Sequence, residues 1–252
     1  MASVSYVTSF SSTTATASYT FTPTFTSSAS SRYLLVIFRS IFGSGASTVS
    51  GVTVGGTAAT LVYSAMTATN MPMAIAYGAV PASTTSASVV VTHSTAAVRA
   101  VASFYLLDGI DVANITANVS TTVSSGTMPN SITATAPYFV VGGVSARQTG
   151  QTATFSTLTS DANIATTNIG LSVGHGSAVS ATYSDTATPS GTTSAAYALI
   201  ALPPVGASTT GQAKIYNGSS FVAKPVKVWN GSAWVTKPLK RWNGSAWVTT
   251  PY

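Results

Sequence analysis

The sequence contains no cysteine and no glutamate, and it has few charged residues of either sign. Without cysteine the chain can form no disulfide bond, bind no metal through a thiolate and use no cysteine nucleophile. Charged residues make up 6% of the chain, against roughly a quarter in an average globular domain. Packing, hydrogen bonding or assembly must therefore supply the stability of this protein.

Groups that could carry acid–base or nucleophilic chemistry are also few, since the chain has two histidines and four acidic residues. His93 lies at the end of a candidate strand, and His175 lies in a turn-like Val-Gly-His-Gly context. Neither histidine accompanies a nucleophile-elbow pattern. Asp108 and Asp111 could pair around a calcium ion, but Asp108-Gly109 is better explained as a turn after a strand. We expect no catalytic residues, no metal site and no cofactor, and so no enzyme.

Long apolar runs are missing as well. The longest strongly apolar run, Tyr33 to Phe38, is far too short to span a bilayer. The first residues, Met-Ala-Ser-Val-Ser, lack the basic and apolar regions of a secretory signal. These features predict a protein that is made in a cytoplasm without membrane insertion.

Serine, threonine, alanine, valine and glycine dominate the sequence, a composition that favours strands over helices. Candidate strands recur about every ten residues between turn residues, which is typical of a sandwich or jelly roll. The apolar segment 32–38 predicts a central strand buried on both faces, Gly55-Gly56 a tight hairpin, and residues 112–130 an edge-like, mobile segment. We predict an all-β fold, with one large antiparallel, jelly-roll-like β-sandwich over residues 1–202.

Composition, charge and periodicity all change after Leu202. Two prolines stop the last strand, and small polar residues follow, which predicts a linker over residues 203–212. Residues 213–252 hold three copies of a 13-residue repeat: KIYNGSSFVAKPV, KVWNGSAWVTKPL and KRWNGSAWVTTPY. Each copy of such a repeat is one supersecondary unit, which buries its apolar face by stacking on its neighbours or on another chain.

Every copy places Asn-Gly between two aromatic residues, which is the strongest short-range signal for a β-hairpin. A four-residue loop would place Trp229 opposite Trp234, whereas a two-residue loop would place Trp229 opposite Ser232. A proline then closes the second strand of each copy. The candidate binding or assembly residues are the six aromatic residues that flank the turns: Tyr216, Phe221, Trp229, Trp234, Trp242 and Trp247.

Three interpretations of these aromatic residues remain open. Packing between stacked hairpins or subunits is favoured, a sugar-stacking platform comes second, and a nucleic-acid platform third. The tail also carries the whole excess of positive charge, because the four arginines of the body are balanced by four aspartates. The tail cations are Lys214, Lys224, Lys227, Lys237, Lys240 and Arg241. Such cations protect strand edges or attract an anionic surface, so we expect no specific nucleic-acid partner.

The Val-Trp-Asn-Gly-Ser-Ala-Trp-Val and Lys-Pro pattern of the tail resembles the short aromatic repeats that close many structural proteins of tailed bacteriophages. Four body segments resemble a β-rich module of phage tail-associated and virion surface proteins: 32–37, 52–60, 73–81 and 98–100. The resemblance implies a non-enzymatic virion structural protein. A tail fibre or tail-tip appendage with a role in host attachment is the leading interpretation, and a capsid decoration or head-fibre protein is the alternative.

A phage carbohydrate-active enzyme such as a depolymerase is less favoured, because it needs two positioned carboxylates and the chain has four aspartates in all. As partners the resemblance implies other virion proteins, further copies of the chain in a homo-oligomer, for which we predict a trimer, and a host surface glycan. The expected location is the virion, after synthesis in the host cytoplasm.

Overall fold

The computed structural model describes residues 2–43, 47–68, 70–122, 126–134, 136–147, 150, 152–178, 181–190, 194–205, 213–216, 221–224, 227–236, 240–242 and 247–249. The chain divides into two compact units, Met1–Val205 and Gly206–Tyr252. The all-β prediction is confirmed, and the described residues contain one short helical element, the 3-10 turn Val112–Asn114. The division falls inside the expected linker 203–212, of which residues 206–212 lie outside the described part.

Nine described strands form the first half of the body. They are β1 (Ser3–Ser12), β2 (Thr16–Phe21), β3 (Arg32–Ile41), β4 (Val49–Val54), β5 (Thr57–Ala58), β6 (Thr60–Ala68), β7 (Met71–Val80), β8 (Val89–Ala97) and β9 (Arg99–Asp108). An inner sheet has the order β1-β9-β3-β7-β6, and an outer sheet has the order β2-β8-β4-β5. All the pairs are antiparallel, and the strand order is that of a jelly roll with β6 as an added edge strand.

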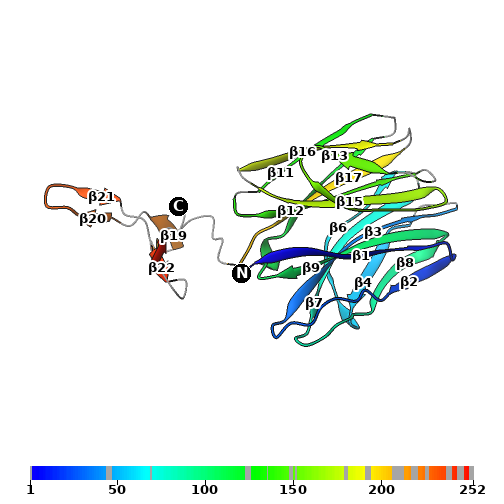
Figure 1. Cartoon of the computed structure of the whole chain (residues 1–252), viewed down its shortest axis with the longest axis horizontal. Helices are drawn as coiled ribbons and strands as arrows, with labels where there is room; N and C mark the ends of the chain where they lie inside the picture. Colours follow the sequence, from blue (N-terminus) through cyan, green and yellow to red (C-terminus); the bar gives the residue numbers. More distant parts are fainter. Residues whose placement is uncertain are drawn as a thin grey trace. The chain divides into compact units, whose positions relative to one another are not determined.

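Eight described strands form the second half of the body. They are β10 (Thr116–Thr122), β11 (Met128–Thr133), β12 (Phe139–Ala146), β13 (Ala153–Phe155), β14 (Thr159–Thr166), β15 (Ile169–Ser177), β16 (Thr182–Pro189) and β17 (Ala195–Leu202). The inner sheet has the order β10-β17-β12-β15-β14, and the outer sheet has the order β11-β16-β13. Figure 1 shows the two sets of strands, blue to green and green to yellow, one above the other within the body.

The two halves share one topology. The strands of the two inner sheets correspond one to one in their order across the sheet: β1 to β10, β9 to β17, β3 to β12, β7 to β15 and β6 to β14. Each inner sheet also has a bulge at the same place, opposite Ile75 of β7 and opposite Val173 of β15. The predicted β-sandwich is therefore confirmed, and the structure divides it into two consecutive jelly rolls that the strand rhythm of the sequence did not reveal.

The shared bulge fixes which residues correspond. Ile75 pairs with Ile37 and Val173 pairs with Gly143, so Ile37 corresponds to Gly143 and Val36 to Gly142. These two corresponding positions also meet between the inner sheets, because a Cβ on Gly143 would lie 3.1 Å from a methyl carbon of Ile37. The contacts between the halves are reciprocal: β14 lies against β1 and β9, and β6 lies against β10 and β17. The two jelly rolls are thus related as the subunits of a twofold dimer are.

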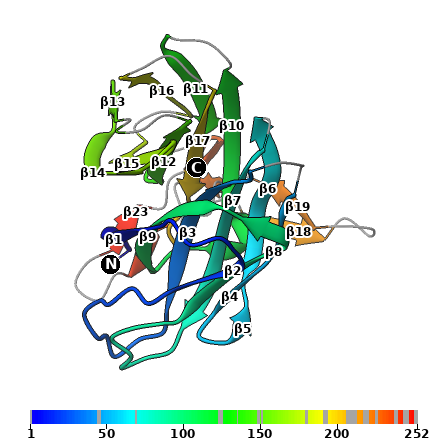
Figure 2. The same ribbon diagram turned by 90° about the vertical axis from the view of Figure 1, so that its right-hand side faces the viewer.

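The sheets of the body are stacked in layers (Figure 2). These four sheets enclose three apolar cores. The first core lies between the two sheets of the first jelly roll, the second between the two inner sheets, and the third within the second jelly roll. Every side chain of β3 except that of Tyr33 is buried, because β3 lies between β9 and β7 and its two faces pack into the first and second cores. This confirms the prediction for residues 32–38.

Several local predictions can be compared with the strands. Gly55 and Gly56 have positive φ values of 58° and 82° and connect β4 to β5, as the predicted hairpin requires. The segment 112–130, expected to be edge-like and mobile, contains β10 at the edge of an inner sheet and the start of β11. The sequence pattern did not predict β14, because the alternation of Thr159–Thr166 carries few large apolar residues.

The described residues of the second unit form three antiparallel strand pairs, one for each copy of the repeat. The pairs are β18 (Ala213–Tyr216) with β19 (Phe221–Lys224), β20 (Lys227–Trp229) with β21 (Trp234–Thr236), and β22 (Lys240–Trp242) with β23 (Trp247–Thr249). The turns of the first and third copies and the closing prolines Pro225, Pro238 and Pro251 lie outside the described residues. The predicted array of hairpin repeats is confirmed at the level of strand pairing.

Candidate functional site

The hairpin of the second repeat is described from Lys227 to Thr236. Trp229 pairs with Trp234 across the ladder, and their ring centroids lie 5.8 Å apart with the planes inclined by 59°. The four-residue loop is therefore confirmed, and the alternative that placed Trp229 opposite Ser232 is wrong.

An Asx turn explains why this loop begins with Asn-Gly-Ser. The Oδ1 atom of Asn230 accepts hydrogen bonds from the backbone N–H groups of Ser232 and Ala233, at 2.9 and 2.8 Å, and from the Ser232 hydroxyl at 3.1 Å. The backbone N–H of Asn230 donates to the carbonyl oxygen of Ala233 at 3.0 Å. Gly231 has a φ of 102°, which a residue with a side chain rarely adopts. The triplet Asn-Gly-Ser also matches the N-glycosylation pattern, but the turn is enough to explain it.

The other two hairpins have the same register. Tyr216 pairs with Phe221 in the first, and Trp242 pairs with Trp247 in the third. The six candidate residues thus form the last ladder pair of each hairpin, on either side of the Asn-Gly segment. Their role in binding or assembly stays a prediction.

The two tryptophans of the second hairpin are exposed within the chain, Trp229 to 51% and Trp234 to 65%. The favoured interpretation, packing between stacked hairpins or subunits, needs far greater burial than these two side chains have. Val228, on the other face of the hairpin, is 48% exposed. An isolated two-stranded hairpin is marginal in water, so a partner that covers these side chains would also stabilise the fold of the hairpin.

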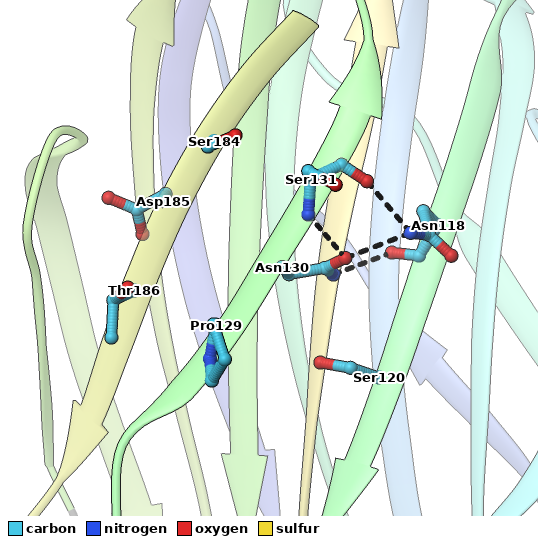
Figure 3. Close-up of a pocket in the computed structure, with 8 residues that line it drawn as sticks. All are labelled: Asn118, Ser120, Pro129, Asn130, Ser131, Ser184, Asp185 and Thr186. Atoms are coloured by element: carbon cyan, nitrogen blue, oxygen red, sulfur yellow. Dashed lines mark hydrogen bonds between the residues drawn. The ribbon is translucent and has the colours of Figure 1, made fainter.

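A polar groove is the second candidate site, on the second jelly roll (Figure 3). Its volume is about 490 Å³, and its lining residues come from β10, β11 and β16: Asn118, Ser120, Pro129, Asn130, Ser131, Ser184, Asp185 and Thr186. Asn130 donates to the carbonyl oxygens of Asn118 and Tyr197, both at 3.0 Å, and accepts from Asn118 Nδ2 and Ser131 N. Its amide is fully engaged in joining the two sheets at this edge, so Asn130 is structural.

One carboxylate beneath the groove organises the interior of the second jelly roll. Asp185 accepts hydrogen bonds from Ser156 Oγ, Thr157 N, Thr157 Oγ1 and the hydroxyl of Tyr197. Burial by itself raises the pKa of Asp185, but the hydrogen bonds from Tyr197, Thr157 and Ser156 favour the charged form and leave the pKa below its ordinary value. Asp185 is therefore a buried anion that fixes the segment 156–158. Its carboxylate oxygens already accept the hydrogen bonds of these donors.

A histidine, an aspartate and a tyrosine meet where the two jelly rolls join. Nδ1 of His175 lies 2.8 and 2.9 Å from the carboxylate oxygens of Asp161, and the hydroxyl of Tyr105 donates to the same carboxylate at 2.8 Å. Asp161 is the bulge residue of β14, and the bulge turns it toward β9. The expected turn-like context of His175 is wrong, because His175 lies within β15. Among the described residues, no hydroxyl forms a hydrogen bond with Nε2 of His175. The cluster therefore has the His–Asp pair of a hydrolase triad but no serine nucleophile.

His93 and Arg39 are buried polar residues with incomplete hydrogen bonding. His93 lies inside β8 rather than at the strand end expected from the sequence, bonds to Ser40 Oγ at 2.9 Å, and is surrounded by Tyr19, Phe38 and Phe42. Burial lowers the pKa of His93, which keeps the ring neutral. Enclosed in this way, His93 reaches no solvent-borne substrate.

Arg39 has no exposed surface, and its Nε and Nη1 atoms have no hydrogen-bond partner among the described residues. The remaining nitrogen lies 3.7 Å from the sulfur of Met71. Burial lowers the pKa of Arg39 to about 9. Burial of this guanidinium without partners lowers the stability of the fold, and Arg39 is not a binding site.

The pair Asp108 and Asp111 forms the turn that the sequence favoured over a calcium site. Gly109 has a positive φ of 60°, and Asp111 accepts a hydrogen bond from Asn114 Nδ2 at 2.7 Å. Within the described ranges, no group of three His, Asp or Glu side chains is arranged to hold a metal ion. The described part of the chain also contains no helix that is long and apolar enough to cross a membrane.

Comparison of the chain with protein-family models and with curated protein sequences gives no match. Function must therefore be inferred from the residues and their arrangement.

Proposed function

We propose that this chain is a non-enzymatic structural protein of a tailed bacteriophage, displayed on the virion as a tail fibre or tail-tip appendage with a role in host attachment. The observation that carries the proposal is the exposed tryptophan pair of the second hairpin. This hairpin belongs to a repeat that is present in three copies. The resemblance of this repeat to those of phage structural proteins gives the particle as the setting.

The mechanism is multivalent contact. One hairpin offers a small surface, so a single contact is weak, but three hairpins per chain and several chains per particle multiply the effective affinity. The partners are other virion proteins, further copies of the chain in a trimer, and a glycan of the host surface. The body supplies a rigid support, since its described ionisable side chains mainly serve the fold.

A capsid decoration or head-fibre protein is the second candidate. It is favoured by the charge distribution, because all the excess positive charge lies in the tail and could dock the chain onto an acidic shell. In that arrangement the body faces outward and the repeats face the particle.

Immunogold electron microscopy with an antibody against the body tests the proposal on phage particles. Labelling at the tail fibre or tail tip is expected, together with loss of adsorption when the antibody is bound. Labelling spread over the head supports the second candidate instead. Absence of the protein from purified particles would overturn both.

A further inference from the structure

The second hairpin has two faces of different chemistry. Side chains alternate between the faces of a strand, so Lys227 and Trp229 share one face, and Trp234 joins them from the paired position. Val228 and Val235 pair on the opposite face. Lys227, Trp229 and Trp234 are all exposed, so the first face presents two aromatic rings beside a cation. We name Lys227, Trp229 and Trp234 the aromatic face.

The rings of the aromatic face are available to a ligand. The two indole planes are inclined by 59° rather than stacked, and more than half of each side chain is exposed. Indole is an apolar plate with one N–H donor at its edge, so it suits a ligand that is itself apolar on one side and hydroxylated at its rim. A pyranose ring has this character, with its C–H groups on the faces and its hydroxyl groups around the edge.

The positive charge of the tail indicates which class of ligand suits the aromatic face. Six Lys and Arg residues and no Asp or Glu lie between Gly206 and Tyr252, and each repeat begins with a lysine two positions before an aromatic residue. A positive surface attracts anions and repels a second copy of itself. The aromatic face is therefore a poor match for the same face of another chain and a good match for an acidic ligand.

We propose that the aromatic face binds an anionic polysaccharide, with the sugar rings stacked on Trp229 and Trp234 and the acidic groups near Lys227. The equivalent pairs of the other repeats, Tyr216 with Phe221 and Trp242 with Trp247, have the same register. This inference rests on the proposed attachment function and adds the chemical class of the receptor.

Single-stranded nucleic acid is the competing polyanion, because bases also stack on aromatic side chains. Proteins that bind it combine such platforms with a continuous positive groove along the backbone. The body adds no net positive charge to that of the tail, since its four arginines are balanced by four aspartates. The observations therefore favour the polysaccharide.

A fluorescence titration of the full chain tests the proposal directly, because all four tryptophans of the protein lie in the tail. The probes are polygalacturonate as the acidic polysaccharide, dextran as the neutral one, and oligothymidylate as the single-stranded nucleic acid. A shift of the tryptophan emission with polygalacturonate alone is expected, and binding should weaken with added salt.

Variants separate the aromatic face from the rest of the hairpin. W229A/W234A should weaken polygalacturonate binding about tenfold, and K227E should weaken it about threefold while leaving the emission of the free protein unchanged. V228T on the opposite face is the matched control and should bind within about twofold of the wild type. K227E keeps both rings, so an unchanged emission of the free variant shows that its loss of binding does not come from unfolding of the hairpin.

The outcomes are distinct. Tighter binding of oligothymidylate than of polygalacturonate, equal binding of dextran, or no binding by any probe would each overturn the proposal. A change of oligomer mass in W229A/W234A without a change in polysaccharide binding would also overturn it, in favour of packing. Polysaccharide binding by a protein that the antibody does not find on particles would contradict the proposed function and leave this inference standing.

Discussion

The two jelly rolls of the body have the same strand order and the same bulge, but they fill their interiors differently. The first has a four-stranded outer sheet and an aromatic core that includes Phe21, Phe38 and Phe104. The second has a three-stranded outer sheet and a core rich in alanine and tyrosine. One topology therefore tolerates two solutions to the same packing problem.

One substitution explains much of the difference. Where the first jelly roll has Val36, the second has Gly142, and the space without a side chain is taken by Leu158 and Tyr197. Leu158 comes from the segment between β13 and β14, which folds inward, and Asp185 holds that segment in place. The second jelly roll thus replaces part of an outer sheet by an inward loop anchored on a buried carboxylate.

Removing an aromatic anchor from the first core should have the largest effect. Phe104 is fully buried against Phe10 and Phe21, with ring centroids 5.8 and 5.9 Å apart. F104A should lower the free energy of unfolding by about 4 kcal/mol, and L199A at the corresponding position of the second core by about 3 kcal/mol. Denaturant titration followed by circular dichroism measures both, and a larger loss in L199A would contradict the account of the two cores.

Removing the carboxylate from the second core comes next. D185A leaves the donors of Thr157 and Tyr197 without an acceptor and should cost about 3 kcal/mol. D185N keeps one acceptor oxygen and should cost about 1 kcal/mol. Equal losses in the two variants would show that the space filled by the side chain, and not its hydrogen bonds, is what matters.

Lowering the pH should reduce the stability of the protein through protonation of Asp185. The pKa of Asp185 is lower in the folded protein than its ordinary value, so its stabilisation is complete above the ordinary aspartate range, about 4, and is lost as the pH falls through the folded pKa. Unfolding free energies measured between neutral pH and pH 3 should therefore fall more steeply for the wild type than for D185N.

Adding one methyl group at Gly142 tests the inward loop. The new Cβ would overlap Leu158 and lie 3.3 Å from the ring of Tyr197, so G142A should cost about 2 kcal/mol. A Cβ at Gly51 would meet no atom within 4 Å, and Gly51 has no positive φ, so G51A is a matched control that should change stability by less than about 0.5 kcal/mol. A neutral G142A would mean that the loop moves aside freely.

The junction between the jelly rolls should contribute less. In D161N, the remaining oxygen can accept from Tyr105 or orient His175, but the amide cannot serve both as the carboxylate does. We expect a loss of about 1 kcal/mol. Differential scanning calorimetry should also show whether the two jelly rolls then unfold in separate transitions; an unchanged single transition with unchanged stability would contradict the role of this cluster.

The smallest effect is expected at Arg39, and its sign is reversed. Because the guanidinium is buried without a counter-ion among the described residues, R39M should leave the stability at pH 7 unchanged or raise it by about 1 kcal/mol. The folded pKa of about 9 lies below that of the unfolded chain, so the cost of the buried charge is present below pH 9 and is relieved as the pH rises. The wild type should gain stability relative to R39M as the pH rises through that folded pKa, and a constant difference would contradict this.

Some of the site was accessible from the sequence and some was not. The Asn-Gly turns and the flanking aromatic residues predicted the hairpins, because those features are local. The pairing of Trp229 with Trp234 was one of two alternatives, and the strand register decided between them. The groove, the Asp185 cluster and the meeting of Tyr105 with Asp161 and His175 were missed, because their members are far apart in the chain. The bulge that turns Asp161 inward has no signal in the sequence.

Local chemistry was enough to specify the strand-rich class, the change of character after Leu202 and the three hairpins, since composition, proline placement and a short period act within a few residues. The division of the body into a pair of jelly rolls, and the residues that correspond in it, emerged from the folded chain alone. Topology is carried by ladders between distant strands, and Val36 in one half can stand where Gly142 stands in the other. The two halves share the backbone pattern while their side chains differ, so their likeness can be recognised in the register and not in the residues.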